Sequence, residues 1–272
     1  MISQSRILLL VVWACFFCAE GQAAKTKQVG EPLFSAAHGF FEKPFALQIT
    51  SKTAGARIYF TTNGLSPDER NGTPYRGPLT ISATTILRAS AYAAGREHSE
   101  AVTGSYIFLR DVVLQTGSGF PTNWGLNQGK PVPADYEMDP EITKSSAYRD
   151  QMLPALQALP AVSIVMPSSD LFDSKKGIYA NPRETGSDWE RDASLELIYP
   201  EGQNGFHINC GIRIQGGWNR RPEESPKHSF RVVFRKNYGP GKLKFPIFGG
   251  GVDEFDTLIL RGGCNNTWLH WH

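Results

Sequence analysis

A glycine turn followed by a lysine, in a strongly cationic stretch, contains the residue types most suited to chemistry. Residues 211–215 alternate as a strand does and are followed by Gly216 and Gly217, and residues 228–235 alternate again after Lys227. Such a hairpin can bind a polyphosphate. The glycine-rich turn between its strands directs backbone N–H groups toward the phosphates, and the lysine adds one ammonium group. A bare hairpin of this kind is more often a solvated sheet edge, so both interpretations stay open on these residues alone.

Positive charge is concentrated in this stretch of the chain. Residues 205–245 carry nine Lys and Arg against two Glu, whereas the whole chain of 272 residues has a formal net charge of only +2. If the strand after the turn is regular, Lys227, Arg231 and Arg235 share one face and the alternate apolar side chains face the core. The small total charge does not indicate nucleic acid or a membrane surface as the partner.

The elements that must position this turn form an α+β pattern over residues 143–272. A helix over residues 147–159 ends at Pro160, and a buried strand over residues 161–166 precedes a helical turn at residues 169–172. Strands are predicted at residues 194–199, 211–215, 228–235 and 256–261, separated by glycine and proline turns. A helix packed against several strands indicates an α+β domain.

The first half of the chain predicts a different module. Short β-type runs cover residues 45–50, 57–62, 79–81, 85–93 and 106–109, and turn formers such as Asn63-Gly64 separate them. This spacing predicts a small antiparallel β-sandwich over residues 32–108 with few contacts to the second domain. Residues 109–142 are rich in Gly, Pro, Asn and Asp and are predicted to be a connector that packs in part through Trp124 and Tyr136.

The N-terminal residues are predicted to be a targeting segment. One positive charge, an apolar run over residues 7–18 and small residues after it form a secretory signal peptide over residues 1–23, so that the mature protein begins at about Ala24 or Lys25. A lipid anchor at one of the two cysteines in the segment is the alternative. The run is short for a membrane span, which predicts a secreted or cell-envelope protein with no membrane span after cleavage. Cys210 and Cys264 then remain, either as one disulfide or as two separate buried thiols.

Residues of the first module resemble a known family. The segments that carry the resemblance are residues 56–59, 61–67, 78–81 and 85–89, with Tyr75 and Ser99. They resemble the fibronectin type III-like sandwiches found beside glycoside hydrolases, including the chitobiase/hexosaminidase C-terminal type, with Asn63-Gly64 where that family usually has Asp-Gly. The resemblance implies a spacer or carbohydrate-associated role. Tyr75 and Tyr92 are candidate sugar-stacking residues, although packing in the sandwich is the stronger interpretation.

A second resemblance covers residues 159–268. It is carried by residues 162–165, 170–172, 177–182, 189–191, 211–217, 225–231 and 243–248. They resemble the N-terminal half of CotH-type proteins, atypical kinases first known from spore coats. The resemblance implies ATP, Mg2+ and phosphoryl transfer to serine of a protein. It assigns Lys227 as the nucleotide-facing lysine, and Arg213, Gly216 and Gly217 as the hairpin above the phosphates.

The same resemblance places the metal-binding and catalytic aspartates after the Asn-Asn-x-Trp segment at residues 265–268, beyond His272. The expected fold is therefore mainly β with an α+β second domain, in which a small sandwich precedes a truncated kinase-like domain. We assign no catalytic residue and no metal site, since His270 and His272 lack a third ligand. Two functions follow: a secreted CotH-like kinase polypeptide that is inactive as given, or a non-catalytic extracellular protein that interacts with a protein or a glycan.

Overall fold

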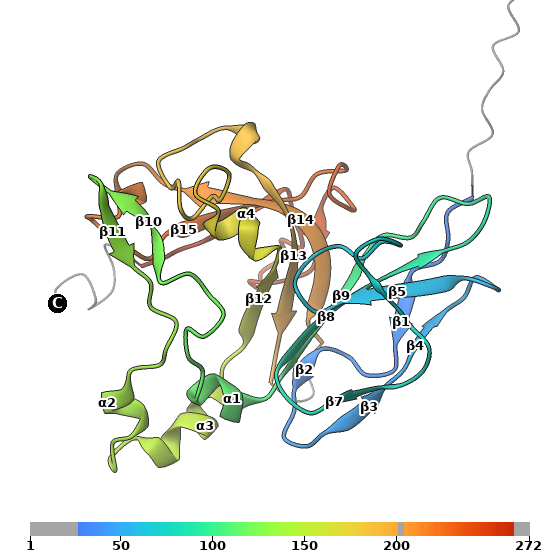
Figure 1. Ribbon diagram of the computed structural model, residues 1–272, viewed down its shortest axis with the longest axis horizontal. Coiled ribbons are helices and arrows are strands. Elements are labelled where there is room, and N and C mark those ends of the chain that lie inside the picture. The colour runs from blue at the N-terminus through green and yellow to red at the C-terminus, as the bar shows by residue number, and fades with distance from the viewer. Residues whose placement is uncertain (1–26, 201–203, 264–272) are drawn as a thin grey trace, which may run out of the picture.

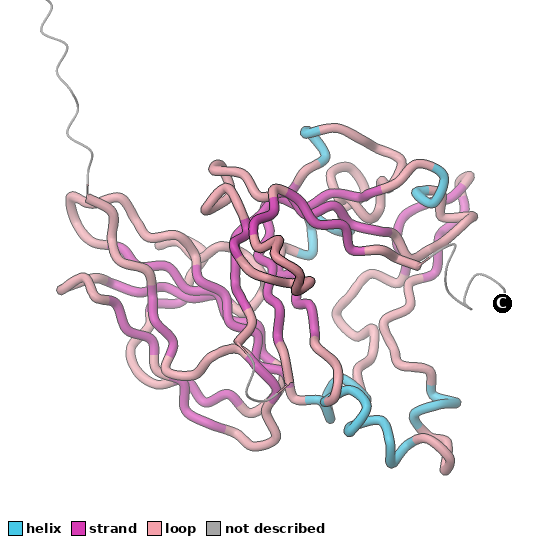
Figure 2. Tube along the Cα trace, turned by 180° about the vertical axis from the view of Figure 1, so that it is seen from behind, coloured by secondary structure: helices cyan, strands magenta, loops and turns pink. Residues whose placement is uncertain are grey.

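The structure is a computed structural model, and it describes residues 27–200 and 204–263. Strands dominate, as the sequence predicts, and they form two groups of sheets side by side (Figure 1). Figure 2 shows the same division from behind. Some of the short helices gather at one corner of the molecule, and others lie between the strands of the second group. Within the described residues, no helix combines the length and the apolar composition that a membrane crossing requires.

The first group is a β-sandwich. Its main sheet has the order β2-β9-β8-β5-β6 and is antiparallel except where β2 pairs with β9, and two strand pairs, β1-β4 and β3-β7, complete it. Its core contains Leu47, Leu87 and Tyr106, which are fully buried. The strands are β1 (Pro32–Phe34), β2 (Gly39–Phe40), β3 (Phe45–Leu47), β4 (Ile49–Ser51), β5 (Arg57–Thr61), β6 (Thr73–Pro74), β7 (Leu79–Ile81), β8 (Thr85–Tyr92) and β9 (Val102–Ile107).

The segment after the sandwich is more ordered than its composition indicates. It contains α1 (Leu109–Val113), the hairpin of β10 (Asn123–Asn127) and β11 (Lys130–Pro133), α2 (Pro140–Thr143) and α3 (Arg149–Gln157). Trp124 packs edge-on against Tyr136 and Tyr179, with ring centroids 5.7 and 5.3 Å apart. The predicted packing through Trp124 and Tyr136 is confirmed, and the helix predicted over residues 147–159 is present as α3.

The second group is a five-stranded antiparallel sheet with the order β12-β13-β14-β15-β18. Ile178, Leu195, Ile212 and Val232 form its core, each at most 2% exposed. The elements are β12 (Ala161–Val165), α4 (Ser168–Phe172), β13 (Arg191–Ile198), β14 (Phe206–Gln215), β15 (Ser229–Val233), the pair β16 (Leu243–Lys244) and β17 (Glu254–Phe255), β18 (Thr257–Leu260), and 3-10 turns at Ser187–Trp189 and Trp218–Arg220.

Hydrogen bonds join the two modules more closely than the sequence indicates. The Glu196 carboxylate on β13 is fully buried, accepts a hydrogen bond from His38 Nδ1 at 2.7 Å, and accepts two more from the backbone N–H and the hydroxyl of Ser105 on β9. Ser105 also bonds to Ser163 on β12, at 2.7 Å between the hydroxyls, and the Thr103 N–H donates to His207 Nε2 at 3.3 Å. We call these contacts the seam. They join two separate sheets through side chains, so no strand is shared.

The glycine of the Asn63-Gly64 turn lies at the same boundary. Gly64 has φ +81°, and a Cβ there would lie 2.3 Å from the carbonyl oxygen of Met166, just after β12. Gly95 has a similar φ of +69°, but a Cβ there would meet no atom within 4 Å. Gly64 is therefore required both by its backbone conformation and by the close approach of the second domain.

We expect Gly64→Ala to lower the free energy of unfolding by about 2–3 kcal/mol, because a left-handed alanine costs about 1–2 kcal/mol and the clash with Met166 adds to it. Gly95→Ala is the matched control and should cost only about 1 kcal/mol. Urea denaturation of both variants measures the difference. Equal losses in the two variants would show that the approach of Met166 costs nothing.

Candidate functional site

The predicted hairpin is present. Strands β14 and β15 pair antiparallel in a register that ends with Gln215 opposite Ser229. The connecting loop therefore leaves the sheet through Gly216 and Gly217 and returns to it through Lys227. This register brings three of the four predicted nucleotide-binding residues to one end of the hairpin.

Arg220 holds the outgoing side of the loop. Its guanidinium donates to the carbonyl oxygens of Ile214 and Gly216 within the hairpin, and to those of Pro182 and Glu184 at 3.0 and 2.8 Å. Gly216 adopts φ +118°, and a Cβ there would lie 2.2 Å from Asn219 Oδ1. The sequence marked Arg220 only as one cation among nine, because nothing in its spacing indicates a bond to backbone carbonyls.

The returning side of the loop is held by Tyr179. Its hydroxyl donates to the Pro226 carbonyl at 3.0 Å and accepts from the His228 N–H at 3.2 Å. His228 is 4% exposed, and burial lowers the pKa of its imidazole to about 4, so the ring is neutral near pH 7. The Lys227 carbonyl accepts from the Ser225 hydroxyl at 2.9 Å, while the Lys227 side chain is exposed.

The predicted cationic face needs a correction. Lys227 precedes β15 and Arg235 follows it, so of the three residues predicted to share one face only Arg231 lies in the strand. Arg213 and Arg231 are register partners on adjacent strands. The Arg231 Nε donates to Gln215 Oε1 at 2.7 Å, which turns this side chain along the sheet.

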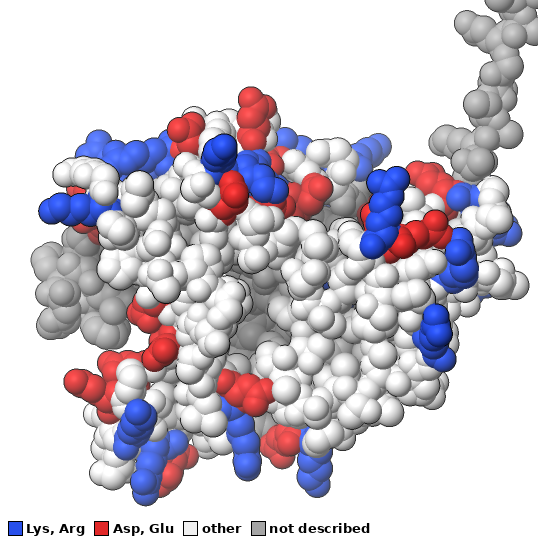
Figure 3. Space-filling model, in the orientation of Figure 1, with Lys and Arg blue, Asp and Glu red and all other residues white. Residues whose placement is uncertain are grey.

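A buried acid neutralises part of that face. Glu190, whose side chain is fully buried, pairs with Arg235 at 2.9 Å and with Arg213 at 3.8 Å, and it accepts from the Tyr238 hydroxyl at 2.9 Å. Arg213 is thus directed at Glu190. Lys227, by contrast, forms no ion pair with any residue of the described ranges. Within the loop itself, Glu223 pairs with Arg183 at 2.7 Å. Figure 3 shows positive and negative side chains intermixed over one face of the molecule.

Among the described residues, the remaining candidates offer neither an activated thiol nor a metal cluster. Cys210 is a buried free thiol, and burial raises its pKa to about 12. Cys264, His270 and His272 lie outside the described residues, so the pairing of Cys210 with Cys264 stays a prediction. Across residues 27–200 and 204–263, no group of three or more His, Cys, Asp or Glu could hold a metal ion.

The comparisons with known proteins concern the sandwich. Residues 36–103 match the family model of the chitobiase/beta-hexosaminidase C-terminal domain. The sandwich resembles this family. The match covers 68 of the 272 residues, so it identifies the module and not the whole chain. Neither the search of curated proteins nor the search of solved structures gave a match.

The two candidate tyrosines of the sandwich take different positions. Tyr75 packs against the sandwich core and its hydroxyl accepts from the Ile49 N–H at 3.1 Å, as the packing interpretation predicts. Tyr92 donates to the Pro67 carbonyl at 3.0 Å and stacks on His98 at 5.3 Å between ring centroids.

Proposed function

We propose that this chain belongs to a secreted CotH-like protein and binds ATP at the β14–β15 hairpin, for phosphoryl transfer to a protein serine. One observation carries the proposal. A loop held at both ends by Arg220 and Tyr179 brings the backbone of Gly216 and Gly217 and the exposed Lys227 to one end of the hairpin. Phosphoryl transfer depends mostly on positioning and on neutralising charge, and a fixed glycine turn with a lysine supplies both.

Each residue has a specific role in this proposal. The N–H groups of Gly216 and Gly217 donate to phosphate oxygens, and the Lys227 ammonium neutralises their charge. Arg213 is engaged with Glu190 and supports the hairpin without contacting the nucleotide. In the overall reaction the γ-phosphoryl group passes from ATP to the serine hydroxyl and leaves ADP.

No cluster of three or more potential metal ligands lies among the described residues, so none of them is assigned to Mg2+. We therefore derive no step through the metal and assign nucleotide binding alone to this part of the chain. Secretion also belongs to the proposal, on the signal segment over residues 1–23, which lies outside the described residues.

A second candidate is a non-catalytic extracellular protein that binds a protein or a glycan. Two observations favour it: the seam joins the sandwich to the second sheet, as a scaffold requires, and Glu190 engages two of the hairpin arginines. Binding of ATP discriminates between the two candidates.

We expect the chain to bind ATP in isothermal titration calorimetry, and Lys227→Met to weaken that binding at least tenfold, because methionine cannot replace a charge-assisted phosphate contact. Lys236→Met, at another exposed lysine three residues after the end of β15, is the matched control and should bind as the wild type does. Neither substitution should move the thermal melt without nucleotide. No ATP binding at millimolar concentration, or equal binding by Lys227→Met, would favour the non-catalytic candidate.

A further inference from the structure

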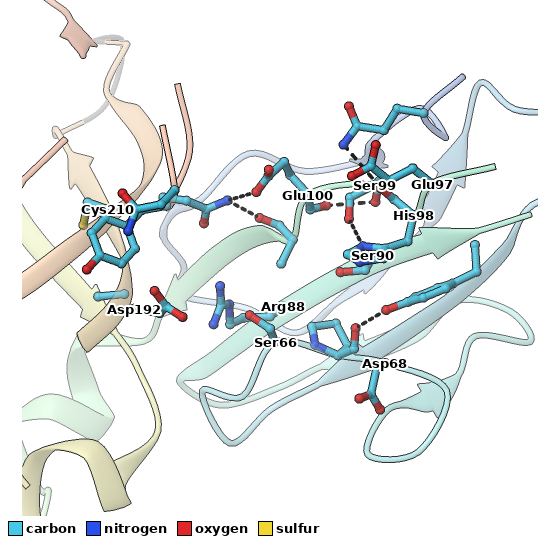
Figure 4. A pocket seen from close by; sticks show the side chains of 18 residues that line it. Ser66, Asp68, Arg88, Ser90, Glu97, His98, Ser99, Glu100, Asp192 and Cys210 are labelled. Carbon is cyan, nitrogen blue, oxygen red and sulfur yellow. Dashed lines mark hydrogen bonds between the residues drawn. The ribbon is translucent and has the colours of Figure 1, made fainter. Parts of the chain in front are cut away.

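A cavity of about 380 Å3 lies at the boundary of the two modules. The sandwich contributes Arg88 and Ser90 from β8, and the second sheet contributes Asp192 from β13 and Asn209 from β14. Figure 4 shows the two walls facing each other, with Arg88 opposite Asp192. Its volume is in the range of about 300–1,000 Å3 that is usual for small-molecule sites.

Arg88 is the unusual group in this cavity. The residue is 5% exposed, its Nη1 donates to the Gly64 carbonyl at 3.0 Å, and its Nε has no hydrogen-bond partner. It points toward Asp192, yet the two side chains form no ion pair within 4.0 Å. A buried guanidinium has five donors to satisfy, so this one lacks acceptors on the side of the cavity.

The opposite wall lacks donors. The Asn209 amide nitrogen donates to the Ala101 carbonyl at 3.0 Å, but its buried Oδ1 has no partner. The Asp192 carboxylate accepts no hydrogen bond from a described side chain, and burial raises its pKa. A group placed between the walls must therefore accept from Arg88 and donate to Asp192 and Asn209. A hydroxyl does both.

The charges of the lining indicate a neutral ligand. Asp68, Glu97, Glu100 and Asp192 line the cavity, which disfavours an anion. Between Arg88 and Asp192, a neutral group with hydroxyls can bond to both walls without placing a positive charge against Arg88. The stacked rings of Tyr92 and His98 also line it and offer a flat surface on which the C–H face of a ring can pack. We propose that this cavity binds a neutral saccharide, whose adjacent hydroxyls bridge Arg88 to Asp192 and Asn209.

The test is a titration of the chain with neutral sugars by isothermal titration calorimetry. The probes are N-acetylglucosamine, chitobiose, cellobiose, maltose and xylobiose. Glycine, a zwitterion, and glutamate, an anion, are the comparisons that carry charged groups. We expect at least one sugar to bind with a dissociation constant below about 1 mM, and Asp192→Ala to weaken that binding at least tenfold. Asp192 is an exposed residue, so its truncation leaves the core intact.

Asp188→Ala removes an exposed aspartate outside the cavity and should bind as the wild type does. Three results would overturn the proposal: no sugar of the panel binds, sugar binding is equal in the wild type and Asp192→Ala, or only the amino acids bind. The ATP titration uses a different site and different variants. A failure to bind sugar therefore leaves the test of ATP binding valid, and a failure to bind ATP leaves the test of sugar binding valid.

Discussion

Glu196→Ala is expected to lower the free energy of unfolding by about 3–5 kcal/mol, the range measured when one partner of a buried charged network is removed. The Glu196 side chain is fully buried between the modules and accepts hydrogen bonds from His38 and from Ser105. Burial alone would raise the pKa of this carboxyl, but the bonds from His38 and Ser105 outweigh burial and hold the pKa below its usual value. The alanine variant loses the acceptor and leaves those donors unpaired.

Urea denaturation measures this loss. Glu184→Ala, at an exposed glutamate, is the matched control and should change stability by less than about 0.5 kcal/mol. Glu196→Gln keeps the shape and one acceptor, so it should fall between the two. A loss below about 0.5 kcal/mol in Glu196→Ala would show that the seam does not hold the modules together.

The chain should also lose stability in mild acid. Burial lowers the pKa of His207 and of His228 to about 4, whereas an unfolded histidine titrates at about 6.5. Between these values the unfolded state binds protons that the folded state does not, so stability is complete above about pH 6.5 and falls as the pH drops toward 4. At about pH 5 each histidine should cost about 2 kcal/mol relative to pH 7.5, and the two together about 4 kcal/mol.

Urea denaturation at both pH values measures this effect in the wild type and in His207→Gln. Glutamine offers an oxygen to the Thr103 N–H in place of the ring nitrogen, but it does not titrate, so about half of the pH dependence should disappear. Equal stability of the wild type at the two pH values would contradict the burial of neutral histidines in the folded state.

Local patterns predicted the elements well. Alternating residues predicted the strands that became β14 and β15, and Pro160 ends the segment after α3 as expected. Gly216 and Gly64 were recognised as turn residues, and both have positive φ. These features depend on neighbours within a few residues, which a single sequence displays.

Long-range contacts were not predictable in the same way. The alternating sequence of β13 predicts a strand with one buried face. Four of its residues in both orientations are nevertheless buried, namely Ser194, Leu195, Glu196 and Ile198. The core of the second sheet covers one face of the strand and the sandwich covers the other. Glu190 precedes Arg213 by more than 20 residues, so no local pattern indicates that it neutralises the cationic face. The partners of Arg220 are backbone carbonyls, which have no signature in the sequence.

The most direct test of nucleotide binding at the hairpin is amine labelling of the chain with and without ATP, read lysine by lysine by mass spectrometry. If the phosphates lie against Lys227, millimolar ATP should protect this lysine at least several-fold, while the exposed Lys236 and Lys242 label at unchanged rates. Equal labelling of Lys227 with and without ATP would contradict the proposal and would make the hairpin a solvated edge of the sheet.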